Sequence, residues 1–203
     1  MQLTARTLIS LACMGLLLSA CTANQQQGAS RGAGVGALAG AAGSMMTALV
    51  FGGNVGEAAA RGAVFGASAG AVTGAVAGNS KDSKEAQQRR AEQEKQLQLL
   101  RKEIGDDAFE GVTALVQCKH EVAMAYGRTA EKSGKANYER AGLWLQALTL
   151  EDMGQETALQ DLAPQIISAD SRINSTETAI ERLESYKESL RQIRAEFDLP
   201  ERC

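Results

Sequence analysis

Residues 62–78 read GAVFGASAGAVTGAVAG, and residues 32–40 read GAGVGALAG. Glycine returns at every fourth position of both stretches, at Gly32, Gly36, Gly40, Gly62, Gly66, Gly70, Gly74 and Gly78. Small residues keep the same frame between them, at Ser44, Ala48, Gly52 and Gly56. Because residues four apart lie on one face of a helix, this spacing predicts helices that carry a stripe without side chains.

Such a stripe lets a second helix approach closely. This packing drives association in lipid, where the hydrophobic effect between helices is absent. In water each glycine costs a helix about 1 kcal/mol relative to alanine, so the long row indicates tertiary packing. Residues 32–56 and 62–78 contain no charge, and Gly52-Gly53-Asn54 is typical of a turn. We expect residues 32–78 to form a glycine-zipper membrane hairpin of two helices, glycine face to glycine face.

Two other interpretations of residues 32–78 remain open: a zipper that associates outside the bilayer, and a flexible Gly/Ala linker. A linker has no reason to keep a four-residue register. The stretch resembles the glycine-zipper domains of outer-membrane lipoproteins, including the SlyB-like and rickettsial surface-antigen types. The resemblance is specific for a packing mode and implies membrane association, but it does not name a function.

The N-terminus has the order of a secretory signal peptide. Met1–Thr7 carries Arg6 and no acid, and Leu8–Leu18 is an apolar run that is short for a membrane span. Four residues that begin at the end of this run, Leu18, Ser19, Ala20 and Cys21, resemble the lipobox of bacterial lipoproteins. An ordinary signal peptide that happens to end in a cysteine is the alternative.

The lipobox resemblance implies that residues 1–20 are removed and that Cys21 receives a diacylglycerol and an amide-linked fatty acid such as palmitate. Several acyl chains anchor a protein durably, since each buried CH₂ contributes about 0.8 kcal/mol. Thr22 stands where an Asp would favour the inner membrane, which implies the outer membrane of a Gram-negative cell. Residues 21–31 then form a lipidated linker, and the domain beyond the zipper faces the periplasm.

The composition changes at Asn79. Lys81–Ile104 is dense in Lys, Glu, Gln and Arg, and we expect residues 79–105 to form a polar spacer helix. Leu97, Leu100 and Ile104 follow a short 3–4 pattern, so a coiled-coil seam is the alternative, although it spans fewer than three heptads.

Residues 106–203 show helical periods throughout and no strand pattern. We expect one helix from Asp107 to about Gly127, a second over Asn137–Met153, and a short helix or turn over Leu159–Ile167 around Pro164. A last helix begins near Ser175 or Thr176 and runs to about Phe197. The predicted fold is all-α: a glycine-zipper helical hairpin, a long polar helix and a small helical bundle in the periplasm.

Two cysteines remain outside the signal and the lipobox. An exported pair favours a disulfide, so Cys118 and Cys203 are predicted to bond; free thiols and intermolecular bonding through Cys203 are the alternatives. His120 is the only histidine and lies two residues after Cys118. On one continuous helix the two side chains would point apart, so we predict no metal site.

No catalytic constellation is present in the sequence, and no cofactor or small-molecule substrate is predicted. The net charge of −3 and the low aromatic content of 4% argue against nucleic acid as a partner. We expect a non-enzymatic, lipid-anchored envelope protein that supports outer-membrane integrity or an envelope complex. Its partners would be membrane lipid and another protein or itself. The alternative is a membrane-active, pore-forming or secretion-associated oligomer built on the zipper.

Overall fold

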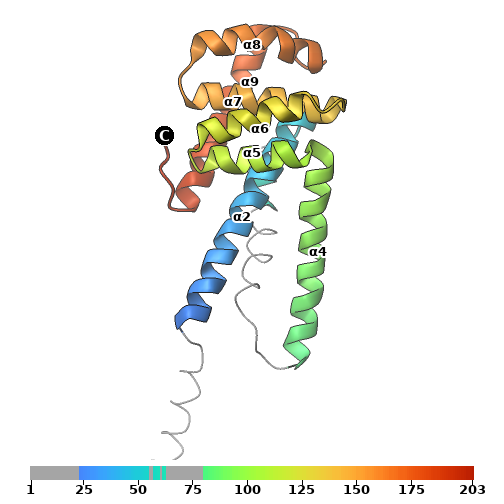
Figure 1. The fold of residues 1–203 in the computed structure, drawn as a ribbon, viewed down its shortest axis with the longest axis vertical. Helices are drawn as coiled ribbons and strands as arrows, with labels where there is room; N and C mark the ends of the chain where they lie inside the picture. Colours follow the sequence, from blue (N-terminus) through green and yellow to red (C-terminus); the bar gives the residue numbers. More distant parts are fainter. Residues whose placement is uncertain (1–22, 55–56, 60, 63–79) are drawn as a thin grey trace, which may run out of the picture.

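The computed structural model describes residues 23–54, 57–59, 61–62 and 80–203, and these residues form helices and no strand. The predicted all-α fold class is confirmed. The helices are α2 (Ala23–Phe51), α4 (Ser80–Ile104), α5 (Asp106–Val116), α6 (His120–Glu131), α7 (Ala136–Asp152), α8 (Glu156–Ala169) and α9 (Thr176–Glu196). Figure 1 shows α5 to α9 gathered at one end, which we call the head, with α2 and α4 projecting from it in the same direction.

Helix α7 forms the centre of the head. Every residue from 141 to 150 is buried, and Trp144 and Leu145 have no exposed surface. Helix α6 approaches α7 closely where both carry glycine: a side chain on Gly142 would overlap the backbone of α6 at Gly127. Small residues at these positions therefore set the distance between the two helices.

The prediction of one helix over Asp107–Gly127 is wrong. Helix α5 ends at Val116, and α6 begins at His120. Between them Cys118 has a φ of 61°, a left-handed conformation that a right-handed helix excludes. Its amide donates to the carbonyl of Leu115 at 3.0 Å, a bond that closes the end of α5. The apolar period continues across the break, so periodicity alone could not reveal it.

The last two helices agree more closely with the expected positions. Helix α8 is longer than predicted and contains Pro164, because its apolar face holds it against α7 through Leu159 and Ile166. Helix α9 begins where predicted: Ser175 is its N-cap, and the Ser175 hydroxyl accepts a hydrogen bond from the amide of Thr178 at 3.2 Å.

The C-terminal half of α2 belongs to the core of the head. Met45, Met46 and Leu49 have no exposed surface, and they share one hydrophobic cluster with Phe109 and Trp144. Residues between Leu38 and Val50 of the predicted zipper segment thus share one core with the predicted domain 106–203, while the boundaries of the two segments stay a prediction. None of the described helices combines the length and the apolar character needed to cross a bilayer.

Helix α4 follows the predicted pattern of a polar helix with a buried end. The side chains of Glu92, Glu94 and Lys95 are exposed, whereas Leu100 packs on the core and Ile104 is fully buried. Tyr138 of α7 fixes this end, because its hydroxyl donates to the carbonyl of Lys102 at 3.0 Å.

Candidate functional site

The predicted lipidation site lies outside the described residues. Cys21 and the lipobox residues Leu18, Ser19 and Ala20 come just before α2, whose first residue, Ala23, is two positions after Cys21. Any lipid on Cys21 would therefore be attached almost directly to the start of a long helix.

The glycine ladder is described in part. Gly32, Gly36 and Gly40 lie on α2, whereas Gly66, Gly70, Gly74 and Gly78 lie outside the described residues. Gly62, the first glycine of the second row, contacts the first row: a side chain there would overlap the Gly40 carbonyl and the Ser44 hydroxyl of α2. Both partners belong to the four-residue frame, so this contact has the glycine face to glycine face geometry expected of the ladder.

A glycine outside the frame joins α2 to the head. A side chain on Gly43 would overlap the ring of Phe109, a core residue of α5. The same ring also carries Arg101 of α4, whose guanidinium carbon lies 4.3 Å from the ring centre. One face of α2 thus contacts Gly62, and another face contacts the head.

Arginines from the head cap the C-terminal end of α2, which has no basic residue in its own last turn. Arg172 donates to the carbonyls of Leu49, at 3.1 Å, and Val50. Arg140 donates to the Val50 carbonyl at 3.3 Å. Cations near the last carbonyls of a helix are stabilising, because these groups carry the negative end of the helix dipole.

Asp170 holds Arg172 in this position. Its carboxylate is buried and accepts from the Arg172 Nε at 2.8 Å and from the indole of Trp144 at 3.0 Å. Burial by itself would raise the pKa of Asp170, but the hydrogen bonds from Arg172 and Trp144 outweigh it and lower the pKa below its ordinary value. We call Arg172, Asp170, Trp144 and Arg140 the Arg172 cluster.

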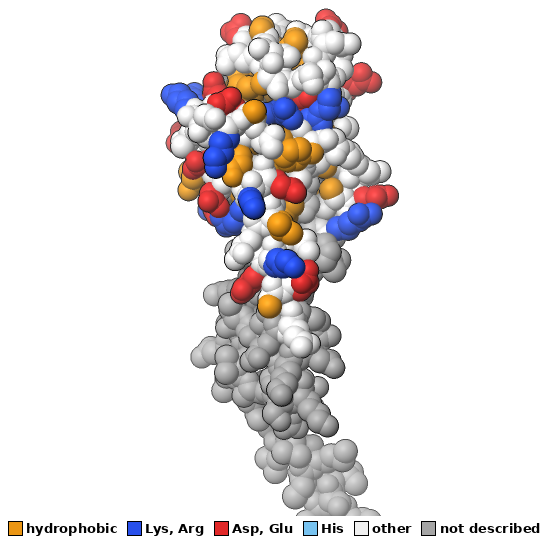
Figure 2. Space-filling view, turned by 90° about the vertical axis from the view of Figure 1, so that its right-hand side faces the viewer, with side chains coloured by type: hydrophobic (Ala, Val, Ile, Leu, Met, Phe, Trp, Pro, Cys, Tyr) orange, Lys and Arg blue, Asp and Glu red, His pale blue; other side chains and the backbone are white. Residues whose placement is uncertain are grey.

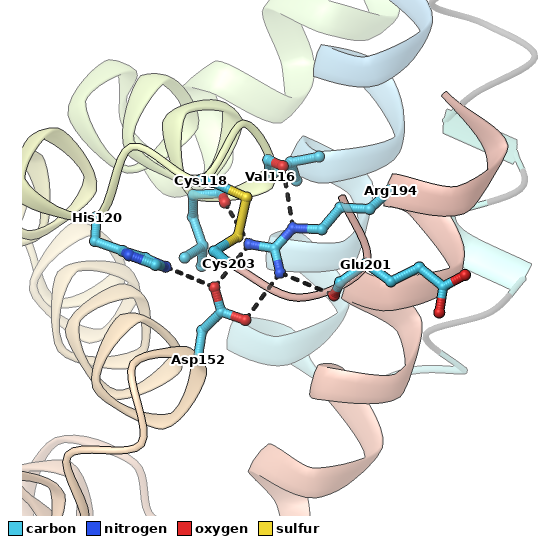
Figure 3. Close-up of a disulfide and its surroundings, with 8 residues drawn as sticks. Val116, Cys118, His120, Asp152, Arg194, Glu201 and Cys203 are labelled. Carbon is cyan, nitrogen blue, oxygen red and sulfur yellow. Dashed lines mark hydrogen bonds and ion pairs between the residues drawn. A yellow bond between two sulfur atoms is a disulfide. The ribbon is translucent and has the colours of Figure 1, made fainter. Parts of the chain in front are cut away.

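A second arginine performs the same task inside the head (Figure 3). Arg194 of α9 is fully buried and donates to the last carbonyls of α5, at 2.7 Å to Leu115 and 3.1 Å to Val116. Two further bonds, of 2.8 Å and 2.7 Å, join it to both carboxylate oxygens of Asp152. This bidentate pair is the strong form of an arginine–carboxylate interaction.

His120 completes this group, which we call the Arg194 cluster (Arg194, Asp152 and His120). The His120 Nε2 lies 2.7 Å from Asp152 Oδ2. Burial opposes the charged form of Asp152, but the hydrogen bonds from Arg194 and His120 prevail and lower the pKa of the carboxyl group. Asp152 is therefore an anion held between two partners.

The disulfide lies directly beside the Arg194 cluster (Figure 3). The structure joins Cys118 to Cys203 across 85 positions, with the Cα atoms 5.5 Å apart. Cys118 is the residue at the break between α5 and α6, and Cys203 follows the end of α9. The bond thus ties the segment after α9 to the loop after α5.

A cleft opens on the other side of His120, between α6, α7 and α8. Its volume is about 520 Å³. Its lining combines the apolar side chains of Met124, Leu150 and Leu162 with polar and charged ones, among them Gln146, Gln165, Glu121, Arg128 and Asp161.

Neither arginine cluster was predicted from the sequence. Arg172 and Asp170 lie in a connection whose sequence shows no special pattern. Arg194 did leave a signal, because it interrupts the apolar stripe of the last predicted helix at a position that proves to be fully buried. A charge on a core face indicates a buried partner, but not which one.

These features define an all-α protein in which a glycine-bearing helix is capped and held by a helical head. Residues 1–82 match the protein family described as YMGG-like Gly-zipper. No curated protein and no solved structure matches the chain. The predicted glycine-zipper domain is confirmed, and it indicates membrane association, while the SlyB-like and lipoprotein assignments stay predictions.

Proposed function

We propose that this protein is a non-enzymatic lipoprotein of the outer membrane, in which the zipper helix holds a periplasmic, partner-binding head at a set distance from the lipid. The observation that carries the proposal is the continuity of α2 from Ala23 to Phe51. At 1.5 Å per residue its 29 residues extend over roughly 43 Å. The helix begins two residues after Cys21 and ends in the core of the head.

A helix that is held at both ends keeps a fixed distance between them, whereas a flexible linker does not. The upper end of α2 is held by its burial in the core, by the Gly43–Phe109 contact and by the two arginine caps. The contact of Gly62 with α2 adds a second helical segment beside it. These contacts support a spacer role for the zipper beyond simple attachment.

The head has the surface of an interaction module. Figure 2 shows basic and acidic side chains interspersed with apolar ones on one face, without a large patch of one charge. The cleft between α6, α7 and α8 adds a concave surface, and the large apolar side chain of Met153 beside it is 41% exposed. The buried ionic groups bond to one another and to helix ends, which supports a structural role for them.

Lipid attachment is tested with Cys21→Ser and the matched variant Cys118→Ser, each expressed in a Gram-negative host with radioactive palmitate. We expect Cys21→Ser to lose the label, to keep its signal peptide and to leave the outer-membrane fraction. Cys118→Ser should keep the label and the membrane location. A Cys21→Ser protein that is still processed and still bound to the outer membrane would contradict the lipid anchor.

Partner binding is tested by cross-linking and pull-down of the full lipidated chain. A fragment that starts at residue 81 is unsuitable as bait, because Leu38–Val50 supply part of the core. Charge is introduced into the cleft with Met153→Glu and, as control, on exposed α9 with Gln192→Glu. Loss of the captured protein with Met153→Glu alone supports the proposal, whereas equal capture by both variants places the partner elsewhere.

A further inference from the structure

The disulfide and the Arg194 cluster together bring four metal-binding side chains to one place. They come from the loop after α5, the first residue of α6, the last residue of α7 and the segment after α9: Cys118, His120, Asp152 and Cys203. One ligand atom each from His120, Asp152 and Cys203 lies within 4.8 Å of the others, and the Cys118 sulfur is bonded to that of Cys203. The break at Cys118 permits this arrangement, which one continuous helix would prevent.

Two thiolates, one imidazole and one carboxylate form a donor set that zinc accepts in tetrahedral sites. With zinc–ligand bonds of about 2.0–2.3 Å, ligand atoms in such a site lie roughly 3.3–3.8 Å apart. Separations of up to 4.8 Å among the ligand atoms of His120, Asp152 and Cys203 therefore need a contraction of about 1 Å, whereas the 2.7 Å between His120 Nε2 and Asp152 Oδ2 must lengthen by about 0.6 Å. Cys203 can supply the contraction, because this residue is exposed and lies beyond the last helix.

The local charge balances in both chemical states. With the disulfide formed, the buried charges are the Asp152 carboxylate and the Arg194 guanidinium, which neutralise each other. One Zn²⁺ with two thiolates and one carboxylate leaves a single negative charge, which Arg194 again neutralises. A buried charge is tolerated when it is paired, so Arg194 suits the metal-bound state as well as the oxidised state.

We propose that reduction of the Cys118–Cys203 disulfide converts this place into a binding site for zinc or a similar divalent metal, with Cys118, Cys203, His120 and Asp152 as ligands. A dithiol supplies two electrons and two protons to the S–S bond and becomes a cyclic disulfide itself. The two new thiols then release their protons as they bind the metal as thiolates. The same two sulfur atoms therefore serve either the disulfide or the metal.

The test uses the full chain with Cys13→Ser and Cys21→Ser, so that Cys118 and Cys203 are the only thiols. The protein is reduced with a phosphine, freed of metal and titrated with Co²⁺ and then Zn²⁺ without oxygen. We expect one Co²⁺ per chain, thiolate-to-cobalt charge-transfer absorption, the strong visible bands of a tetrahedral site, and displacement by Zn²⁺. The oxidised protein should show none of these signals.

His120→Gln is the decisive variant, because His120 lies at the edge of the site and the Arg194–Asp152 pair remains in place without it. It should weaken zinc binding by about tenfold or more, since even outer-shell partners of zinc ligands contribute that much. Gln117→Ala, an exchange in the same loop, should bind as the parent does. Zinc should also raise the melting temperature of the reduced parent but not of the oxidised protein.

Three results would overturn the proposal. The first is cobalt binding without charge-transfer absorption, and the second is equal zinc affinity in the parent and in His120→Gln. The third is loss of helical circular dichroism on reduction that zinc does not restore, because the site requires the folded head to bring its ligands together.

Discussion

Two arginine–aspartate pairs perform the same task at two places in this protein. Arg194 caps α5 and is held by Asp152, while Arg172 caps α2 and is held by Asp170. Neither capped helix has a basic residue in its own last turn. A distant part of the chain supplies the cation in both cases, so each cap is also a tertiary contact.

The two arginines differ in their access to water, although the side chains of both aspartates are largely buried. The side chain of Arg194 has no exposed surface, whereas that of Arg172 is 29% exposed. The first joins helices of the head to one another beside a disulfide, and the second joins the head to the zipper helix. Water can replace lost hydrogen bonds at a partly exposed site far better than at a buried one. We therefore expect the hydrogen bonds between Arg172 and the last carbonyls of α2 to open at a lower free energy than the unfolding of the head.

The largest effect is expected from Arg194→Met. It leaves Asp152 buried without its main partner and removes the donors to the Leu115 and Val116 carbonyls. Breaking a buried pair in this way costs about 3–5 kcal/mol. Urea unfolding followed by circular dichroism measures the loss. Arg191→Met, whose side chain is partly exposed and lies 3.6 Å from Glu188, should change stability by less than about 1 kcal/mol.

Arg172→Gln should have a smaller and more local effect. The Leu49 and Val50 carbonyls lose a donor, but Arg140 still donates to Val50, and buried Asp170 keeps the Trp144 indole and the backbone amide of residue 172, so we expect a loss of about 1–2 kcal/mol. Hydrogen exchange should speed up in the last turns of α2 and stay slow in α7. Arg182→Gln is the control, because its nitrogen lies 3.9 Å from Asp170, beyond hydrogen-bond range. If Arg172→Gln costs as much stability as Arg194→Met, the exposure of Arg172 to water does not make its pair weaker.

Acid should weaken both pairs gradually. The pKa values of Asp152 and Asp170 are lowered in the folded protein from an ordinary value of 3.8. Below about pH 4 the unfolded chain therefore binds more protons than the folded one, so the free energy of unfolding falls as the pH falls. Urea unfolding between neutral pH and about pH 3 measures this slope. Asp152→Asn should flatten the slope, and an unchanged slope would show that Asp152 is not the group that titrates.

The smallest effect is expected beside the Arg194 cluster. Lys187 donates to Glu151 at 2.6 Å, but its side chain is 33% exposed. Lys187→Met should cost about 0–1 kcal/mol, as is usual for ion pairs in contact with water. The unfolding midpoint in urea gives this value. A loss as large as that of Arg194→Met would mean that exposure does not govern the strength of these pairs.

Local patterns predicted much of the fold and less of the site. Apolar period and the Ser175 cap placed α7 and α9 to within about two residues. The same kind of pattern missed the break at Cys118, because the apolar faces of α5 and α6 stay in phase across it. It also could not show that Asp152 and Arg194 meet, since their contact spans 42 positions and depends on how α7 and α9 pack.

The sequence by itself determined the all-helical class and the glycine register, because a repeat of four residues defines a helix face wherever that helix lies. Only the tertiary structure decided what covers each face. Gly40 and Ser44 meet Gly62, Gly43 meets Phe109, and Met45, Met46 and Leu49 enter the core of the head. Apolar side chains gain from leaving water in either lipid or protein, so hydrophobicity alone does not distinguish the two surroundings. The packing of α5, α7 and α9 provides the protein interior that this part of α2 occupies.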